Sequence, residues 1–240
     1  MKTFGFIAIL ILAPLFPGHL FAQQCDVDSG FRGNRFEVDR FSRKHLLKPI
    51  GKLSDLPAEV RRKLENHLTE KLGKRFLKHL QFEGGEYLDL VALRTESPKE
   101  YEINSKIGSY DFLFRFSKPS KGLKYFYSRI ALFEDGSVAD DIALPNVSLD
   151  SAKAALIPCK DASMIAGKNG FPLKYQNIEF GYSFSADAFV WIVSDRRAIE
   201  PDKTGGVADL VLMGKGTFRR IEIEAHTGKV LRIYKETIVV

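Results

Sequence analysis

The sequence predicts an α+β protein in which two successive modules each place a helix on an antiparallel sheet. Two similar stretches, YSRIALFEDGSV at residues 127–138 and FRRIEIEAHTGKV at 218–230, predict matched hairpins about one small domain apart. A helical segment precedes the strand-like segments in both halves of the chain. A helix packed across an antiparallel sheet buries the apolar faces of both, which favours this fold class.

Residues 1–22 predict a cleaved secretory signal peptide. Lys2 supplies a positive charge, residues 4–16 are almost wholly apolar, and Ala22 is a small residue suited to cleavage. The apolar run is too short for a comfortable membrane span. We therefore expect a bacterial periplasmic or secreted protein with no transmembrane span in the mature chain.

The chain has two cysteines, Cys25 and Cys159. In an oxidising compartment the simplest prediction is one disulfide between them. Closing so long a loop contributes about 4–5 kcal/mol in the chain-entropy model. Two alternatives stay open: a pair of buried free thiols, or a lipid anchor on Cys25. Lipidation is disfavoured because Gln24, rather than a small residue, precedes that cysteine.

Residues 23–52 predict an irregular N-terminal segment. Phe31, Phe36 and Phe41 recur every five residues in this polar stretch. We expect these rings to anchor the segment over a core.

The clearest helix is predicted over residues 53–73. Ser54 and Asp55 offer caps, and Pro57 suits a first helical turn. An apolar stripe repeats every four residues, at Val60, Leu64, Leu68 and Leu72. Gly73 is expected to end the helix or to loosen it.

After the helical segments, both halves of the chain contain runs that predict strands. In the first module, residues 53–147, strand-like runs cover 86–95, 109–117 and 123–133, and a turn at 134–136 returns the chain through 138–144. In the second module, residues 148–240, short helices at 151–157 and 159–168 precede strands at 175–184, 189–194, 207–213 and 217–225. A turn at 226–228 then leads into 229–235.

The C-terminal run IEIEAHTGKVLRIYKE, residues 221–236, resembles the closing hairpin of PepSY domains. The run CKDASMIAGKNG at 159–170 resembles their opening helix, and SDLPAEVRRKLENHL at 54–68 is similar to the helix of PepSY-like envelope proteins. His226 departs from the family pattern, where an acidic or small residue is more usual. The resemblance covers most of residues 53–240. It implies a cystatin-like fold in two tandem modules, and extracytoplasmic binding or inhibition of peptidase-like partners without catalytic residues.

Positive charge is concentrated near the N-terminus. Residues 32–81 contain 14 Lys and Arg against six Asp and Glu. The candidate binding face on the first helix consists of Arg61, Arg62, Lys63, Lys71, Lys74, Arg75 and Lys78. Such a face suits an anionic envelope surface, although a solvated helix face has the same composition.

The sequence contains no recognisable catalytic or metal-binding motif. No mature histidine has a second ligand at metal-motif spacing, so we predict no metal site and no cofactor. Tyr110, Phe112, Phe114 and Phe116 alternate along one strand, which is typical of a core face. No nucleic-acid-binding motif appears either.

These observations favour a secreted or periplasmic, non-catalytic binding protein. We expect an envelope or extracellular protein as its partner, and inhibition of a peptidase is the specific form of this expectation. One alternative is a binder of an anionic envelope surface through the basic first helix. A second alternative is an enzyme of unrecognised type.

Overall fold

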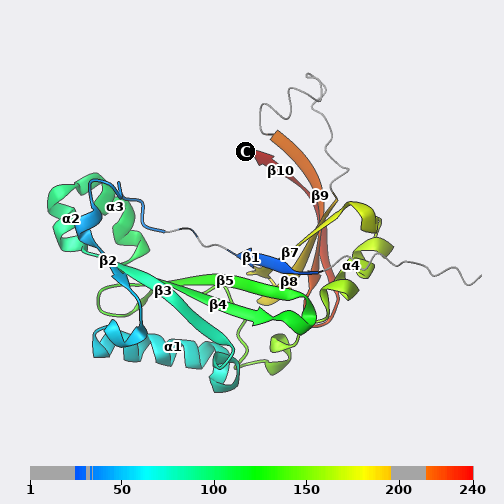
Figure 1. Cartoon of the computed structure of the whole chain (residues 1–240), viewed down its shortest axis with the longest axis horizontal. Helices are drawn as coiled ribbons and strands as arrows, with labels where there is room; N and C mark the ends of the chain where they lie inside the picture. The colour runs from blue at the N-terminus through cyan, green and yellow to red at the C-terminus, as the bar shows by residue number, and fades with distance from the viewer. Residues whose placement is uncertain (1–24, 31–32, 34, 196–214, 240) are drawn as a thin grey trace, which may run out of the picture.

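The computed structural model describes residues 25–30, 33, 35–195 and 215–239 (Figure 1). Its helices are α1 (Ala58–Leu77), α2 (Leu90–Glu96), α3 (Pro98–Ile107) and α4 (Cys159–Lys168). Its strands are β1 (Val27–Gly30), β2 (Leu47–Ile50), β3 (Leu80–Leu88), β4 (Tyr110–Lys118), β5 (Leu123–Leu132), β6 (Val138–Asp140), β7 (Gln176–Ser183), β8 (Ala188–Asp195), β9 (Lys215–Glu224) and β10 (Val230–Val239). Short 3₁₀ turns occupy Lys44–Leu46, Leu53–Asp55, Pro119–Lys121, Ser151–Ala154 and Leu173–Tyr175. The α+β class is confirmed; the signal peptide and the expected strand 207–213 lie outside the described residues.

The strands form two sheets. The larger sheet has the order β1-β5-β4-β3-β2, with β6 also paired to β5, and the smaller has the order β10-β9-β8-β7. All pairs are antiparallel except β1 with β5. β1 also lies against β7, where the backbone N–H of Phe180 donates to Ser29 Oγ at 3.0 Å. The edges of the two sheets therefore meet at β1 and β7.

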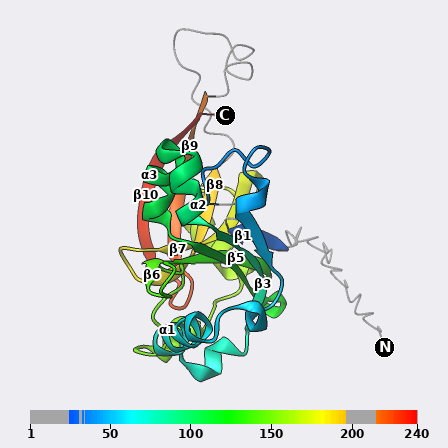
Figure 2. The ribbon, with the colours of Figure 1, turned by 90° about the vertical axis from the view of Figure 1, so that its left-hand side faces the viewer.

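Helix α1 runs along one face of the larger sheet, and α4 lies beside the smaller one (Figures 1 and 2). The predicted stripe is confirmed, because Val60, Leu64, Leu68 and Leu72 are all buried. Gly73 breaks the helical geometry with φ 72°, and the helix continues beyond this kink to bury Phe76. Glycine adopts this backbone conformation without a Cβ clash.

A single apolar core joins the two sheets. Phe116 of β4 stacks on Phe76 of α1, with ring centroids 5.0 Å apart, and on Phe189 of β8 at 5.6 Å. Phe126 of β5 meets Phe180 of β7 edge to face at 5.3 Å. Aromatic pairs in these geometries each contribute about 0.5–1.5 kcal/mol beyond the area that they bury. The expected core role of the β4 aromatic face is confirmed, since all four of its rings are buried.

The predicted disulfide between Cys25 and Cys159 is present, and it ties the N-terminal segment to the first residue of α4. Gly122 makes the approach possible. A Cβ at this position would lie 2.8 Å from the Cβ of Cys25 and 2.9 Å from that of Cys159. The turn between β4 and β5 therefore packs directly against the Cys25–Cys159 disulfide.

The expected strand at 86–95 is wrong beyond Leu88. Strand β3 ends there, and the chain forms α2 and α3 before it enters β4. The Asp89 carboxylate caps α2 by accepting from the backbone N–H of Ala92 at 3.0 Å. Pro98 starts α3, which suits a residue without a backbone N–H. A short apolar run such as residues 90–93 fits either a strand or a helix, and this ambiguity concealed the N-cap signal.

The expected irregular character of residues 23–52 is also wrong in part, because β1 and β2 pair with the larger sheet. Phe36 is buried in a small second core under α2 and α3, whereas Phe41 is 96% exposed. Phe31 lies outside the described residues. Asn104 of α3 fixes the segment, because its amide accepts from the backbone N–H of Glu37 and donates to the carbonyl of the same residue.

Removing the disulfide tests how strongly it stabilises the fold. We expect the double variant Cys25→Ser/Cys159→Ser to lose about 2–5 kcal/mol of unfolding free energy, because the long loop is no longer closed in the unfolded chain. Urea unfolding followed by circular dichroism measures the change. Reduced wild-type protein serves as the control and should lose a similar amount. Equal stability of the oxidised and reduced wild-type protein would contradict this expectation.

Candidate functional site

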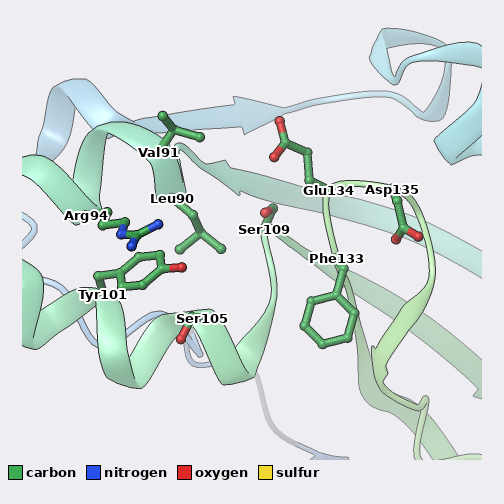
Figure 3. A pocket seen from close by; sticks show the side chains of 9 residues that line it. All are labelled: Leu90, Val91, Arg94, Tyr101, Ser105, Ser109, Phe133, Glu134 and Asp135. Atoms are coloured by element: carbon green, nitrogen blue, oxygen red, sulfur yellow. The ribbon is translucent and has the colours of Figure 1, made fainter.

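A groove of about 400 Å³ lies between the α2–α3 pair and the turn that connects β5 to β6 (Figure 3). This volume falls within the range of small-molecule and peptide pockets. The groove is lined by Leu90, Val91, Arg94, Tyr101, Ser105, Ser109, Phe133, Glu134 and Asp135.

The chain between α3 and β4 is held tightly against the larger sheet. Gly108 has φ 112°, and a Cβ there would lie 2.5 Å from the carbonyl oxygen of Leu132. The backbone of Ser109 donates to that carbonyl at 2.8 Å and accepts from the N–H of Leu88, also at 2.8 Å. The position of Ser109 on the groove floor is therefore fixed by β3 and β5 together.

The opposite wall is a tight hairpin turn. The carbonyl of Phe133 accepts from Gly136 N–H at 2.9 Å, and the Asp135 carboxylate accepts from the backbone and hydroxyl of Ser137. These hydrogen bonds lower the pKa of Asp135. Lys63 of α1 donates to the Asp135 carbonyl at 2.7 Å, so the turn is anchored to the first helix.

The groove offers apolar surface to a ligand. Val91 is 70% exposed and Phe133 is 37% exposed, and both flank the half-buried side chain of Leu90. Exposed apolar groups that gather in a concave site are typical of binding surfaces.

Several polar groups of the groove have no partner among the described residues. Arg94 forms no ion pair and contacts only the ring of Tyr101, whose centroid lies 5.6 Å from the guanidinium carbon. The hydroxyls of Tyr101 and Ser109 and the carboxylate of Glu134 also form no hydrogen bond with the described residues, although Ser109 is only 2% exposed. Arg94 and Glu134 are exposed and Tyr101 is half-buried, so these polar groups face solvent and are open to a ligand.

These groups occupy opposite sides of the groove. Figure 3 shows Arg94 and Tyr101 on one side and Glu134 with Asp135 on the other, with Leu90 and Ser109 between them. Sequence reasoning missed all of these residues as a site. The cap at Asp89 and the Ser97–Pro98 helix start are the local signals that could have revealed the two helices.

A second cavity of about 360 Å³ lies beside α1 and is lined by His67, Glu70, Lys71, Asp141, Asn146, Leu149 and Asp187. The Asp141 carboxylate lies 2.7 Å from His67 Nε2 and accepts from Lys71 Nζ at 2.5 Å. The Asp187 carboxylate accepts from the Tyr182 hydroxyl at 2.8 Å and from Lys153 Nζ at 2.6 Å. Both carboxylates in this cavity are therefore already paired.

These hydrogen bonds shift the pKa values of Asp141, Asp187 and Tyr182. Burial raises the pKa of Asp141, but the hydrogen bonds from His67 and Lys71 outweigh it and bring the pKa to about 2. Burial likewise opposes the hydrogen bonds from Lys153 and Tyr182 that lower the pKa of Asp187. Burial and the hydrogen bond to Asp187 raise the pKa of Tyr182. Asp141 therefore forms a structural tie between α1 and the segment that follows β6, and Asp187 ties the β7–β8 turn to residues 146 and 153.

The predicted basic face of α1 is largely neutralised. Four of its members are paired: Arg61 with Glu65, Arg62 with Glu59, Lys63 with Asp135, and Lys71 with Asp141. The other three, Lys74, Arg75 and Lys78, are exposed at the C-terminal end of the helix and form no ion pair with the described residues.

Within the described residues, no group of three or more His, Cys, Asp or Glu side chains is placed to hold a metal ion. No helix of this part of the chain is long and apolar enough to cross a membrane. Comparison of the chain with protein-family models, with curated proteins and with solved structures finds no match. The fold and the groove therefore define a disulfide-linked α+β protein with a concave, partly apolar groove.

Neutralising Asp141 should weaken the tie in a pH-dependent way. A carboxylate with a lowered native pKa adds stability above its unfolded pKa, and this contribution is lost as the pH falls from about 3.8 toward about 2. We expect Asp141→Asn to cost about 1 kcal/mol at pH 7, a value reduced by its partial exposure to solvent. The difference from wild type should shrink as the pH falls from 5 to 3.

Urea midpoints at each pH measure this difference. Glu70→Gln is the matched control, because it removes the same charge from the same cavity at a side chain without a partner among the described residues. A stability difference for Asp141→Asn that stays constant between pH 5 and pH 3 would exclude this role.

Proposed function

We propose that this chain is an exported, non-catalytic binding protein that holds a segment of another envelope or extracellular protein in the groove between α2–α3 and the β5–β6 turn. The observation that carries the proposal is the convergence of unpaired polar groups on a partly apolar concavity. Ligand sites are typically concave and partly apolar, with a few polar groups that can orient a ligand. The disulfide is compatible with export to an oxidising compartment.

The proposed architecture is a pair of tandem PepSY-like, cystatin-like modules. The element order supports it: α1 precedes the meander β3-β4-β5-β6, and α4 precedes the meander β7-β8-β9-β10. Under this proposal, α2 and α3 are an insertion between the first two strands of the first module. Inhibition of a peptidase is the specific form of the proposed function.

A capture experiment tests the groove. The chain from residue 23 onward is immobilised, and envelope extract is passed over wild type and over the variant Val91→Asp/Phe133→Ser. We expect the variant to retain at least tenfold less of a specific protein partner, because a carboxylate and a hydroxyl replace exposed apolar surface. A captured peptidase whose activity falls on binding would support the inhibitory form.

Leu149→Ser is the matched control, because Leu149 is 84% exposed and lies in the other cavity. Circular dichroism establishes that all variants are folded. Identical capture by the groove variant and the control would refute binding through the groove.

A second candidate function is binding to an anionic envelope surface through the C-terminal end of α1. The observation that favours it is the exposure of Lys74, Arg75 and Lys78 without partnering carboxylates among the described residues. Such a cluster gains attraction to anionic lipid that is screened by salt.

This second hypothesis predicts that Lys74→Glu/Arg75→Glu/Lys78→Glu abolishes salt-sensitive retention on vesicles rich in phosphatidylglycerol. Charge reversal of Arg61 and Arg62 is the control. It should have a smaller effect, since both already pair with glutamates on α1. Sedimentation with vesicles at low and high salt measures retention. Equal effects of the two variants would argue against a site at this end of the helix.

A further inference from the structure

We propose that the groove recognises the free C-terminal carboxylate of a peptide whose last side chain is apolar. This inference rests on the proposed function of the groove and names the chemistry of its ligand. The inference starts from Arg94, which lines the groove and forms no ion pair with the described residues.

Arg94 has no carboxylate partner among the described residues, although two glutamates of the same helix pair are engaged elsewhere. Arg43 lies within ion-pair distance of both Glu96 and Glu100, at 3.3 and 3.4 Å, and His45 Nε2 lies 2.9 Å from Glu96. Glu96 of α2 and Glu100 of α3 are thereby engaged by the N-terminal segment. Arg94 is left with its guanidinium at the groove.

The donors on this side of the groove match a carboxylate. A guanidinium presents a planar fork that can bind both carboxylate oxygens, and stacking on Tyr101 restricts its orientation. The Tyr101 hydroxyl lies on the same side (Figure 3). On the floor, the hydroxyl of Ser109 forms no hydrogen bond with the described residues and can bond the backbone of a bound peptide.

The apolar surface lies beside these donors. In a peptide, the C-terminal carboxylate and the last side chain are attached to the same Cα atom, so their sites must be neighbours. Leu90 and Val91 are on the same helix as Arg94 and supply such a neighbouring apolar site. An internal aspartate or glutamate would place a carboxylate at Arg94, but the same residue would have no apolar side chain to fill the neighbouring site.

The opposite wall argues against a phosphate group. Glu134 and Asp135 line the groove across from Arg94, and one arginine does not offset two carboxylates and a dianion. A singly charged carboxylate is tolerated, and the acidic wall favours the N–H groups or a basic side chain of the preceding peptide. Charge complementarity therefore selects a peptide end over a phosphorylated ligand.

The test uses tripeptides that are acetylated at the amino end, random at the first two positions and ended by leucine. One set carries a free C-terminal carboxylate, and the other carries a C-terminal amide. We expect the wild-type protein to bind the acid set at least tenfold more tightly than the amide set, measured by isothermal titration calorimetry. Arg94→Gln should make the two affinities equal.

Arg62→Gln is the control, because Arg62 is an exposed arginine on α1 that already pairs with Glu59. This variant should keep the preference for the free acid. Acid peptides ended by glycine should bind more weakly than those ended by leucine.

Equal binding of acids and amides to wild type, or no binding of either set at millimolar concentration, overturns the carboxylate inference. The same follows if Arg94→Gln keeps the preference for the acid. The proposed function survives these outcomes if the Val91→Asp/Phe133→Ser variant still loses its protein partner. It fails separately if capture does not depend on the groove.

Discussion

The mutual contact of the rings of Phe76, Phe116 and Phe189 is the interaction on which the rest of the structure depends. It joins the first helix, the larger sheet and the smaller sheet in one apolar core. Neither sheet can shift without opening this stack, because core rings sit in close-packed environments. The disulfide adds a second link, from the N-terminal segment to α4. Helices α2 and α3 pack on a separate small core. Their arrangement therefore does not depend on the contacts that join the two sheets.

The two cavities differ in what their polar groups do. In the cavity beside α1, Asp141 is engaged by His67 and Lys71 of the first helix, and Asp187 is engaged by Lys153 and Tyr182. In the groove beside α2 and α3, Arg94 and Glu134 remain without such partners among the described residues. Groups that already pair within the chain have little capacity left for a ligand, whereas exposed groups exchange water for ligand contacts on binding. The groove is therefore the better candidate for ligand binding, and the cavity beside α1 is the better candidate for a structural role.

Much of the fold could be predicted from local patterns. The four-residue stripe from Val60 to Leu72 and the Gly-containing hairpin turns depend on near neighbours, and a chain with two cysteines allows only one intramolecular pairing. The α2–α3 pair was missed because the short apolar run at residues 90–93 fits a buried strand as well as a helix, although Asp89 caps a helix there. The groove could not be predicted at all. Its walls are separated by about thirty residues and meet only because the register of β4 with β5 places Tyr110 opposite Leu132.

Under the proposed tandem arrangement, the position of the groove has a physical reason. The first two strands of the second half, β7 and β8, are joined by a short turn in which Asp187 takes φ 44° and ties the turn to residue 146. The corresponding strands of the first half, β3 and β4, are instead joined by α2 and α3. A connection between antiparallel strands can lengthen without disturbing the sheet, since loop-closure entropy rises slowly with length. Asn104 then fixes the longer connection to the N-terminal segment through both its donor and its acceptor. The insertion is thus rigid enough to hold Arg94 and Tyr101 opposite the β5–β6 turn, which a mobile loop would not do.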